Sequence, residues 1–285
     1  MDINKIKESK TTEELIRFSI INIDKPKGPT SFSVGQFIKK SLGLKKTSHL
    51  GTLDPAVTGV LPISLDRACR LNTYLMRKNK TYVGVMRLHE DVSDDKIKEE
   101  MEKFVGKIKQ LPPVRSSVKR AEREREVFSF DFIEKNGKDV LFSSEVEAGT
   151  YIRKLVHDLG VSLGVKAHML ELRRVRAGIF DESKMYNLYD FEKAVSDYKN
   201  GDDSSLREML VPGEIIGNIL KSVEIKPNNL RQILTGKPIF NSDVASKVDI
   251  SEGEYFAVFC NGRLIEIALR VKDGDIFGRP DFVLN

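Results

Sequence analysis

The segment TSHLGTLDPAVTGVLPI, residues 47–63, places a single aspartate among two glycines and two prolines. Helices avoid glycine and proline, and central strands avoid aspartate and proline. We therefore predict a shaped loop that carries Asp54 and runs into a short apolar strand from Val60 to Ile63. Most aspartates that precede a proline are turn residues. A catalytic role for Asp54 therefore needs support from the rest of the chain.

The bulk composition is that of a folded protein of 285 residues, with 40% apolar residues and only two cysteines. The length allows one large domain or two unequal ones. No run approaches 18 consecutive apolar residues, so no membrane-spanning helix is expected. The first residues are polar and mixed in charge, unlike a signal peptide. We therefore expect a cytoplasmic protein with free, reduced thiols and no membrane partner.

Local patterns predict a mixture of helices and strands without regular strand–helix–strand alternation. Strands are predicted at 18–26, 80–89 and 167–178, and helices at 30–44, 67–78, 93–106, 150–164, 188–198 and 204–210. Two alternating segments around Asn136-Gly137 predict a hairpin over 125–149. This order predicts an α+β fold on a mainly antiparallel sheet.

The pattern changes near residues 211–215, where we predict a domain boundary. Beyond it, short strands and turns predict a small C-terminal β-barrel. The predicted division is an N-terminal extension that packs on the small domain, a main domain and the small domain itself, covering residues 1–19, 20–212 and 213–285.

Several kinds of active site lack their signals in this chain. The four histidines are scattered, without the spacing of a zinc site. There is no Walker loop and no dinucleotide or serine-hydrolase motif, so phosphate-binding loops, dinucleotide sites and serine-hydrolase sites lack their signals. The net charge of +5 is modest, but Lys and Arg gather in runs at 39–46, 77–82, 119–126 and 173–176. Such segregation is typical of a groove for a polyanion, although any one run taken alone is better explained as a solvated helix face or turn.

Five segments, in the same order, resemble the TruB/dyskerin family of pseudouridine synthases. They are INIDKPKGPTS (21–31), HLGTLDPAVTGVLPI (49–63), KTYVG (80–84), EAGTYIRKLVHDLG (147–160) and AHMLELRRVRAG (167–178). The resemblance covers about residues 20–180, and the last 70 or so residues resemble a PUA domain, a small RNA-binding β-barrel. It implies a pseudouridine synthase catalytic domain with a PUA-like β-barrel.

The resemblance also implies the chemistry. The family detaches uracil from its ribose, rotates it and rejoins it through C5, without a cofactor or a metal. Asp54 matches the catalytic aspartate, Arg153 the arginine that pairs with it, and Tyr82 the tyrosine that stacks on the flipped base. A buried carboxylate needs such a partner to stay charged, so we expect Asp54 and Arg153 to form a buried pair.

Further residues match positions with supporting roles in this family. His49, Tyr151 and Leu172, with Tyr82, match residues that contact the target nucleotide, while Lys25 and Pro26 match a motif that supports the site. Without the resemblance, Tyr82 would be an ordinary strand aromatic and Leu172 a core residue. The basic residues Lys119, Arg120, Arg123 and Arg125 are expected to position the RNA backbone, unless they form only a solvated turn.

The short connection over residues 111–126 resembles the archaeal and eukaryotic branch of the family, the catalytic subunit of H/ACA ribonucleoproteins. That branch implies an H/ACA guide RNA, an rRNA substrate and small accessory proteins as partners. No Lys-rich tail resembling the nucleolar forms is present, which favours the archaeal type. Two alternatives stay open: a stand-alone enzyme acting on the T-loop uridine of tRNA, and a non-catalytic RNA-binding scaffold.

Overall fold

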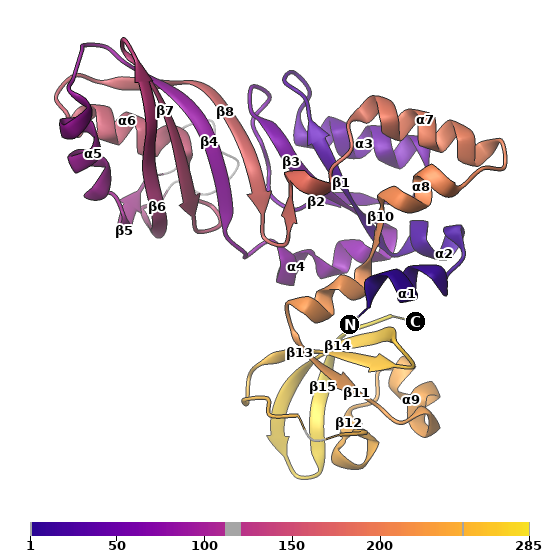
Figure 1. The fold of residues 1–285 in the computed structure, drawn as a ribbon. Coiled ribbons are helices and arrows are strands. Elements are labelled where there is room, and N and C mark those ends of the chain that lie inside the picture. Colours follow the sequence, from indigo (N-terminus) through magenta and orange to yellow (C-terminus); the bar gives the residue numbers. More distant parts are fainter. Residues whose placement is uncertain (1, 112–120, 247, 285) are drawn as a thin grey trace.

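The computed structural model describes residues 2–111, 121–246 and 248–284, and Figure 1 shows how its elements are arranged. The first ten strands are β1 (Ser19–Lys25), β2 (Thr47–His49), β3 (Thr58–Leu65), β4 (Lys80–Leu88), β5 (Gly106–Gln110), β6 (Arg123–Asn136), β7 (Asp139–Val146), β8 (Ala167–Ala177), β9 (Phe180–Asp181) and β10 (Leu210–Pro212). The remaining strands are β11 (Lys221–Glu224), β12 (Ile239–Phe240), β13 (Tyr255–Cys260), β14 (Arg263–Asp273) and β15 (Ile276–Val283).

The α-helices are α1 (Ile3–Glu8), α2 (Thr12–Arg17), α3 (Ser31–Ser41), α4 (Asn72–Leu75), α5 (Asp94–Glu102), α6 (Ile152–Ser162), α7 (Leu188–Lys199), α8 (Ser204–Met209) and α9 (Leu230–Leu234). Two 3₁₀ segments also matter below, η1 (Asp66–Leu71) and η3 (Gly213–Asn218). None of the helices in the described ranges is long and apolar enough to cross a membrane.

The strands form two sheets, which confirms the predicted α+β class. The larger sheet has the order β10-β1-β3-β8-β4-β7-β6-β5, with β2 added on β3 and β9 on β8. Its described pairings are antiparallel apart from the one between β3 and β8, as predicted for a mainly antiparallel sheet. The C-terminal strands form a separate curled sheet with the order β11-β13-β14-β15-β12, in keeping with a PUA-like domain.

Most predicted elements are confirmed because their signals are local. Helix α3, for example, begins after Thr30, whose side chain accepts a hydrogen bond from the Ser33 N–H. Helix α5 begins directly after the predicted N-cap residue Ser93, whose side chain makes no capping hydrogen bond. Residues 67–78 differ from the prediction: they form η1 and the single turn of α4 rather than one helix. The hairpin turn lies on Gly137 and Lys138, because Asn136 already pairs with Asp139.

Strand β3 is longer than the predicted segment from Val60 to Ile63, and it contains a proline. Pro62 lies just beyond the register of β2, which ends with His49 opposite Ile63. There the Pro62 carbonyl accepts a hydrogen bond from the Leu50 N–H at 2.9 Å. Proline is therefore tolerated at position 62, because the hydrogen bond to Leu50 uses the carbonyl oxygen of residue 62 and not the N–H that proline lacks.

The larger sheet consists of two halves that meet at a short seam between β3 and β8. Figure 1 shows β1, β3 and β10 with α3, α7 and α8 on one side, and β4 to β8 with α5 and α6 on the other. The seam pairs only Thr58 with Arg173 and Gly59 with Arg174 in the described register. Gly59 has φ +98°, and a Cβ there would lie 2.2 Å from the Arg174 carbonyl oxygen. The close approach of the halves therefore requires glycine at position 59.

The C-terminal sheet packs against the larger one through a shared hydrophobic cluster. Its members include Phe18, Ile20, Leu71 and Tyr74 from the first part of the chain, and Ile216, Ala257, Phe259, Leu264 and Ile267 from the last part. Lys10 and Glu214 add a buried ion pair at 2.6 Å, with side chains 7% and 1% exposed. Glu14 of α2 also reaches Arg263 of β14 at 3.1 Å. The N-terminal segment thus contacts both parts.

Candidate active site

Asp54 lies in the loop between β2 and β3, beside the first turn of α6. One carboxylate oxygen, Oδ2, is 2.9 Å from Nη2 of Arg153. The predicted partners are therefore brought together from positions 99 residues apart in the chain. The expected burial is wrong, however, because the side chains are 46% and 54% exposed. A loop tip and a first helical turn both face outward here, so water reaches the pair.

Lys25 fixes the loop directly after Asp54. Its side chain is fully buried, and its ammonium donates to the carbonyl oxygens of Pro26, Pro55 and Val57 at 2.9, 3.2 and 2.8 Å. Burial lowers the pKa of Lys25, while the nearby Asp54 carboxylate acts in the opposite direction. These contacts agree with the supporting position predicted for Lys25 and Pro26.

Ser31 anchors the residue before Asp54. Its hydroxyl accepts a hydrogen bond from the Leu53 N–H at 2.8 Å and donates to the Leu53 carbonyl at 3.0 Å. The side chain is 1% exposed. Sequence reasoning missed this role because a serine just inside a helix start is ordinarily a capping residue.

Arg174 and Lys80 lie under the same loop, and neither was singled out from the sequence. Arg174 is 1% exposed and donates to the carbonyls of Val60 and Gly51 at 2.8 and 3.0 Å. The Lys80 ammonium donates to the carbonyls of Met76 and Lys78. Burial, with Arg174 nearby, lowers the pKa of Lys80 to about 8.

Lys25, Lys80 and Arg174 thus share an unusual property. Each is buried, and the hydrogen bonds described for their cationic groups go to backbone carbonyls rather than to carboxylates. Fully buried Lys and Arg are rare unless they are paired. Together they place uncompensated positive charge around the loop, which favours an ionised carboxylate and attracts a phosphate-bearing substrate.

Two predicted substrate contacts lie on the β4 and β8 side of the seam. Tyr82 is opposite Arg174 in the register, half-buried at the edge of the main hydrophobic cluster. Leu172 is opposite Gly84 and 8% exposed. A Cβ on Gly84 would lie 3.0 Å from the Leu172 side chain. Tyr82 and Leu172 therefore sit on the same sheet face, with glycine making room for the leucine.

The other two predicted substrate contacts come shortly before the ion-paired residues in the chain. His49 ends β2, with its Nε2 atom 3.0 Å from the Thr52 hydroxyl. Burial and Arg174 both lower the pKa of His49, so its imidazole is neutral at pH 7. Tyr151 immediately precedes α6, and the side chain of Gln110 holds its backbone. Gln110 is another residue that sequence reasoning missed.

The basic run is only partly open to comparison, since Lys119 and Arg120 lie outside the described residues. Arg125 is 20% exposed and packs on the loop before α6, 3.3 Å from the Cβ position of Gly149. It donates to the Glu124 carbonyl at 2.8 Å. On the neighbouring strand, Lys107 pairs with Glu124 at 3.0 Å. Arg125 thus contacts its own surroundings, and the RNA contacts predicted for Arg123 and Arg125 stay a prediction.

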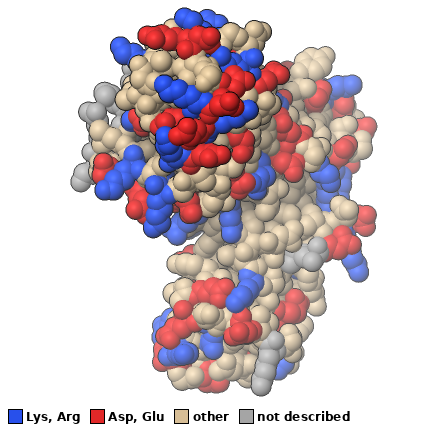
Figure 2. Space-filling model, turned by 60° about the vertical axis from the view of Figure 1, so that its left-hand side comes forward, with Lys and Arg blue, Asp and Glu red and all other residues tan. Residues whose placement is uncertain are grey.

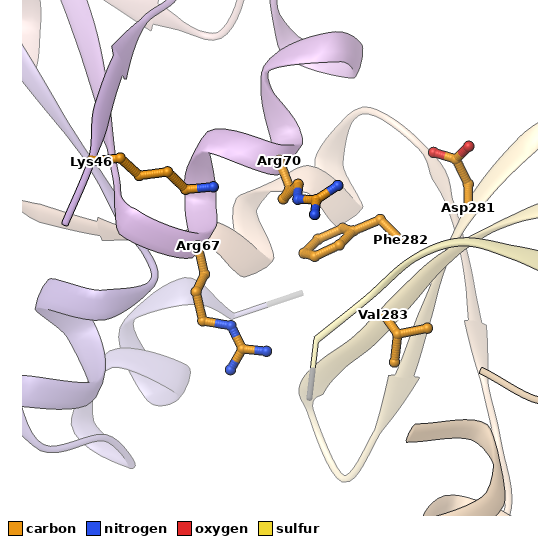
Figure 3. A pocket seen from close by; sticks show the side chains of 6 residues that line it. All are labelled: Lys46, Arg67, Arg70, Asp281, Phe282 and Val283. Carbon is orange, nitrogen blue, oxygen red and sulfur yellow. The ribbon is translucent and has the colours of Figure 1, made fainter. Parts of the chain in front are cut away.

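The expected segregation of charge is not seen on the face in Figure 2, where acidic and basic side chains alternate over the upper part. A separate cavity of about 370 Å³ lies between η1 and β15. Figure 3 shows Lys46, Arg67 and Arg70 on one side of it and Asp281, Phe282 and Val283 on the other. None of the predicted site residues lines this cavity. Within the described ranges, no three His, Cys, Asp or Glu side chains group to hold a metal ion.

Comparison with known proteins places this geometry in a family. Residues 39–152 match the N-terminal domain of the TruB family pseudouridylate synthases, and residues 153–216 match the C-terminal domain of tRNA pseudouridylate synthase B. A "Probable tRNA pseudouridine synthase B" of Pyrobaculum aerophilum is 40% identical over 261 residues, covering 90% of this chain and 78% of the relative. Its namesake in Pyrococcus furiosus is 42% identical over 254 residues, covering 88% and 75%.

Two solved structures are similar over nearly the whole chain. A chain in "Crystal Structure of a Cbf5-Nop10-Gar1 Complex" has a TM-score of 0.89 and 39% identity, covering 97% of this chain and 88% of that one. A chain in "Structure of H/ACA RNP bound to a substrate RNA containing 2'-deoxyuridine" has a TM-score of 0.88 and 36% identity, covering 98% and 89%. The chain described here belongs to the TruB family of pseudouridine synthases.

Proposed function

We propose that the chain converts uridines of ribosomal RNA to pseudouridine as the catalytic subunit of a guide-RNA H/ACA particle. The observation that carries the proposal is the 2.9 Å contact between Asp54 and Arg153. The 39% identity to a chain of the Cbf5-Nop10-Gar1 complex, over 97% of this chain, supports the particle. In the reaction a C1′–N1 bond is replaced by a C1′–C5 bond, C5 loses its hydrogen and N1 gains a proton.

Each site residue has a role in this proposal. Asp54 is the nucleophile, and Arg153 orients its carboxylate and favours its ionised form. The target uridine must leave its stack to reach Asp54, and Tyr82 stacks on the flipped base. His49, Tyr151 and Leu172 complete the contacts to the nucleotide. The pair is solvent-exposed without RNA. Bound RNA therefore provides the exclusion of water that a carboxylate nucleophile needs.

The partners and the location follow from the same proposal. A guide RNA selects the uridine by base pairing, and small accessory proteins assemble on the chain. The C-terminal domain, proposed as residues 213–285, binds RNA, and the N-terminal extension of residues 1–19 packs against it. A cytoplasmic location is supported by Cys69 and Cys260, which are both free thiols.

A stand-alone tRNA enzyme is the second candidate, because the similar archaeal proteins carry the name tRNA pseudouridine synthase B. In that case the T-loop uridine is the target, and neither guide RNA nor partners are needed. A non-catalytic scaffold is disfavoured, since Asp54, Tyr82 and Arg153 are all present.

The deciding experiment is pseudouridine mapping with the purified chain. Unmodified tRNA and an rRNA fragment are each incubated with and without guide RNA and accessory proteins, and Asp54→Asn is the catalytic control. We expect rRNA modification only in the assembled particle and none with Asp54→Asn, which keeps the shape of the side chain but removes its charge. RNA binding by Asp54→Asn should stay close to wild type. Guide-independent modification of tRNA alone would favour the second candidate, and an active Asp54→Asn would refute the assignment of the nucleophile.

A further inference from the structure

Gln110 is hydrogen-bonded to Tyr151, the residue at which α6 starts. It is the last residue of β5, and its side chain is 2% exposed. Its amide oxygen accepts a hydrogen bond from the Tyr151 N–H at 2.9 Å, and its amide nitrogen donates to the Tyr151 carbonyl at 3.2 Å. Both polar ends of one buried amide are therefore used on the backbone of a single residue 41 positions away.

The residue that Gln110 contacts defines the start of α6. Tyr151 is the N-cap residue of α6, and its side chain makes no capping hydrogen bond. The Tyr151 carbonyl accepts the first helical hydrogen bonds, from the N–H groups of Lys154 and Leu155 at 3.0 Å each. Gln110 is thus hydrogen-bonded to both backbone groups of Tyr151: its N–H, and the carbonyl that accepts the first hydrogen bonds of α6. A helix start without a side-chain cap is otherwise prone to fray.

Arg153 lies in this first turn, two residues after Tyr151, and its guanidinium reaches Asp54 at 2.9 Å. The pair is about half exposed, so surrounding side chains do little to fix its geometry. The direction in which Arg153 leaves the helix is therefore set chiefly by the backbone of the first turn. We propose that Gln110 is a positioning residue for the isomerisation, which acts by fixing Tyr151 and thereby the approach of Arg153 to Asp54.

This inference rests on the catalytic roles proposed for Asp54 and Arg153. It gives Gln110 no contact with the RNA, since its amide is buried and both of its ends are used. Loss of the two hydrogen bonds to Tyr151 should therefore lower the rate of the chemical step and leave RNA affinity unchanged. Misplacing a reacting group by about 1 Å can cost on the order of 100-fold in rate.

The test is a double-mutant cycle between Gln110→Met and Arg153→Ala. Methionine keeps the length and approximate volume of glutamine but can make neither hydrogen bond. We expect Gln110→Met to slow single-turnover pseudouridine formation by about 10–100-fold, with the dissociation constant for RNA within about twofold of wild type. In the Arg153→Ala background the same change should have almost no further effect, because its target is gone.

A matched control separates positioning from general destabilisation. Asn22 is also 2% exposed, and its amide nitrogen donates to the carbonyls of Asp181 and Lys184 at 2.9 Å each. Asn22→Ala removes two buried amide hydrogen bonds elsewhere in the sheet and should lower the melting temperature without slowing the chemical step. If Gln110→Met does not fold, Gln110→Glu enters the same cycle. It keeps an acceptor for the Tyr151 N–H, but its ionised carboxylate has no donor and faces the Tyr151 carbonyl oxygen, so a rate below that of wild type is expected.

The outcomes distinguish this inference from the proposed function. A slow Arg153→Ala beside a Gln110 variant of wild-type rate would overturn the positioning role alone. Equal fold-losses from Gln110→Met in both backgrounds would also overturn it, since the effect would then not pass through Arg153. A wild-type rate for Arg153→Ala would instead refute the catalytic pair itself.

Discussion

Buried positive charge is the main feature of the site at the scale of single residues. Removing an ammonium or guanidinium from water is costly unless hydrogen bonds replace the lost hydration. Here backbone carbonyls do so, and several of them belong to the loop around Asp54: Lys25 bonds to Pro55 and Val57, and Arg174 bonds to Gly51 and Val60. The same contacts therefore hold the loop in shape and leave the charge of the cations available to Asp54 and to RNA.

Motifs in the sequence single out the candidate reacting residues more readily than the residues that hold them. Asp54, Arg153 and Tyr82 were proposed because they lie in recognisable motifs, and the structure brings the first two into contact. The roles of Arg174 and Lys80 were missed, because a basic run ordinarily indicates solvent exposure. Their burial depends on how β3, β4 and β8 come together, which no local pattern encodes.

Replacing Arg153 should affect the rate far more than the stability. The pair with Asp54 is about half exposed, and exposed ion pairs contribute roughly 0–1 kcal/mol to folding. We expect Arg153→Ala to lower the free energy of unfolding by less than about 1 kcal/mol while strongly slowing single-turnover pseudouridine formation. Urea unfolding and the rate are measured on the same preparation, with Arg153→Lys as the variant that keeps the charge. A loss of several kcal/mol would mean that the pair is buried in solution.

At the scale of elements, the seam between β3 and β8 determines where the site forms. Strands and helices with clear periodicity and caps were predicted close to their observed bounds, as for α3 and β4. Residues 67–78 were not, because η1 is fixed by a distant contact: the Asp66 carboxylate accepts hydrogen bonds from the N–H groups of Lys45 and Lys46. Such long-range hydrogen bonds override local helical periodicity, and they cannot be read from a single segment.

Gly59→Ala should disrupt the seam and with it catalysis. A Cβ at this position meets the Arg174 backbone at 2.2 Å, and the residue has φ +98°. Gly201 offers a matched control, because it has φ +101° but no atom within 4 Å of its Cβ position. We expect Gly201→Ala to cost about 1 kcal/mol from backbone strain, and Gly59→Ala to cost at least about 2 kcal/mol more and to abolish turnover. Similar losses for both variants in urea unfolding would show that the halves can separate at little cost.

Strand β14 carries a buried carboxyl group that should make stability depend on pH. Glu266 is fully buried, and neither side-chain oxygen has a hydrogen-bond partner among the described residues. Burial raises the pKa of Glu266 from 4.5 to about 8. The folded state therefore binds a proton that the unfolded state has lost between these two values. The contribution of Glu266 to stability is thus fully present below pH 4.5 and is lost as the pH rises towards 8.

This contribution is isolated by comparison with Glu266→Gln, which has the same shape and does not titrate. The difference in unfolding free energy between the two proteins should change by a few kcal/mol between pH 5 and pH 8. Wild type should become less stable relative to Glu266→Gln as the pH rises. Above pH 8 the difference should level off. Parallel pH profiles for the two proteins would show that the carboxyl group is solvated or paired in solution.

At the scale of the whole molecule, the two sheets behave as one structure because they share a core. Phe18 and Leu71 pack in the same cluster as Ile216 and Ile267, and the Tyr74 ring meets the Tyr255 ring edge-on at 5.5 Å. The change in sequence pattern near residue 212 indicates where one part of the chain ends and the next begins. It carries no information about how much surface the two parts bury together. The sequence therefore predicted packing of residues 1–19 on the small domain, but not the part of the contact made by Leu71 and Tyr74.

Truncation before Gly213 should consequently destabilise the part that remains. It would expose the apolar side chains that Ile216 and Ile267 cover, and it would remove Glu214 from Lys10. Because both contacts are buried in the full chain, their loss should take away a large part of the stability of a typical domain.

We expect the chain of residues 1–212 to melt at least about 10 °C below the full chain, or to aggregate, and to lose activity together with its fold. Glu214→Gln in the full chain removes the charge of one partner and leaves the apolar contact, so it tests the ion pair separately, at an expected cost of about 3–5 kcal/mol. Differential scanning calorimetry of the three proteins gives the comparison. One cooperative transition is expected for the full chain, since a shared core couples the two parts. Two separate transitions, with the first part melting at the same temperature alone as in the full chain, would show that the sheets fold independently and that the shared cluster contributes little.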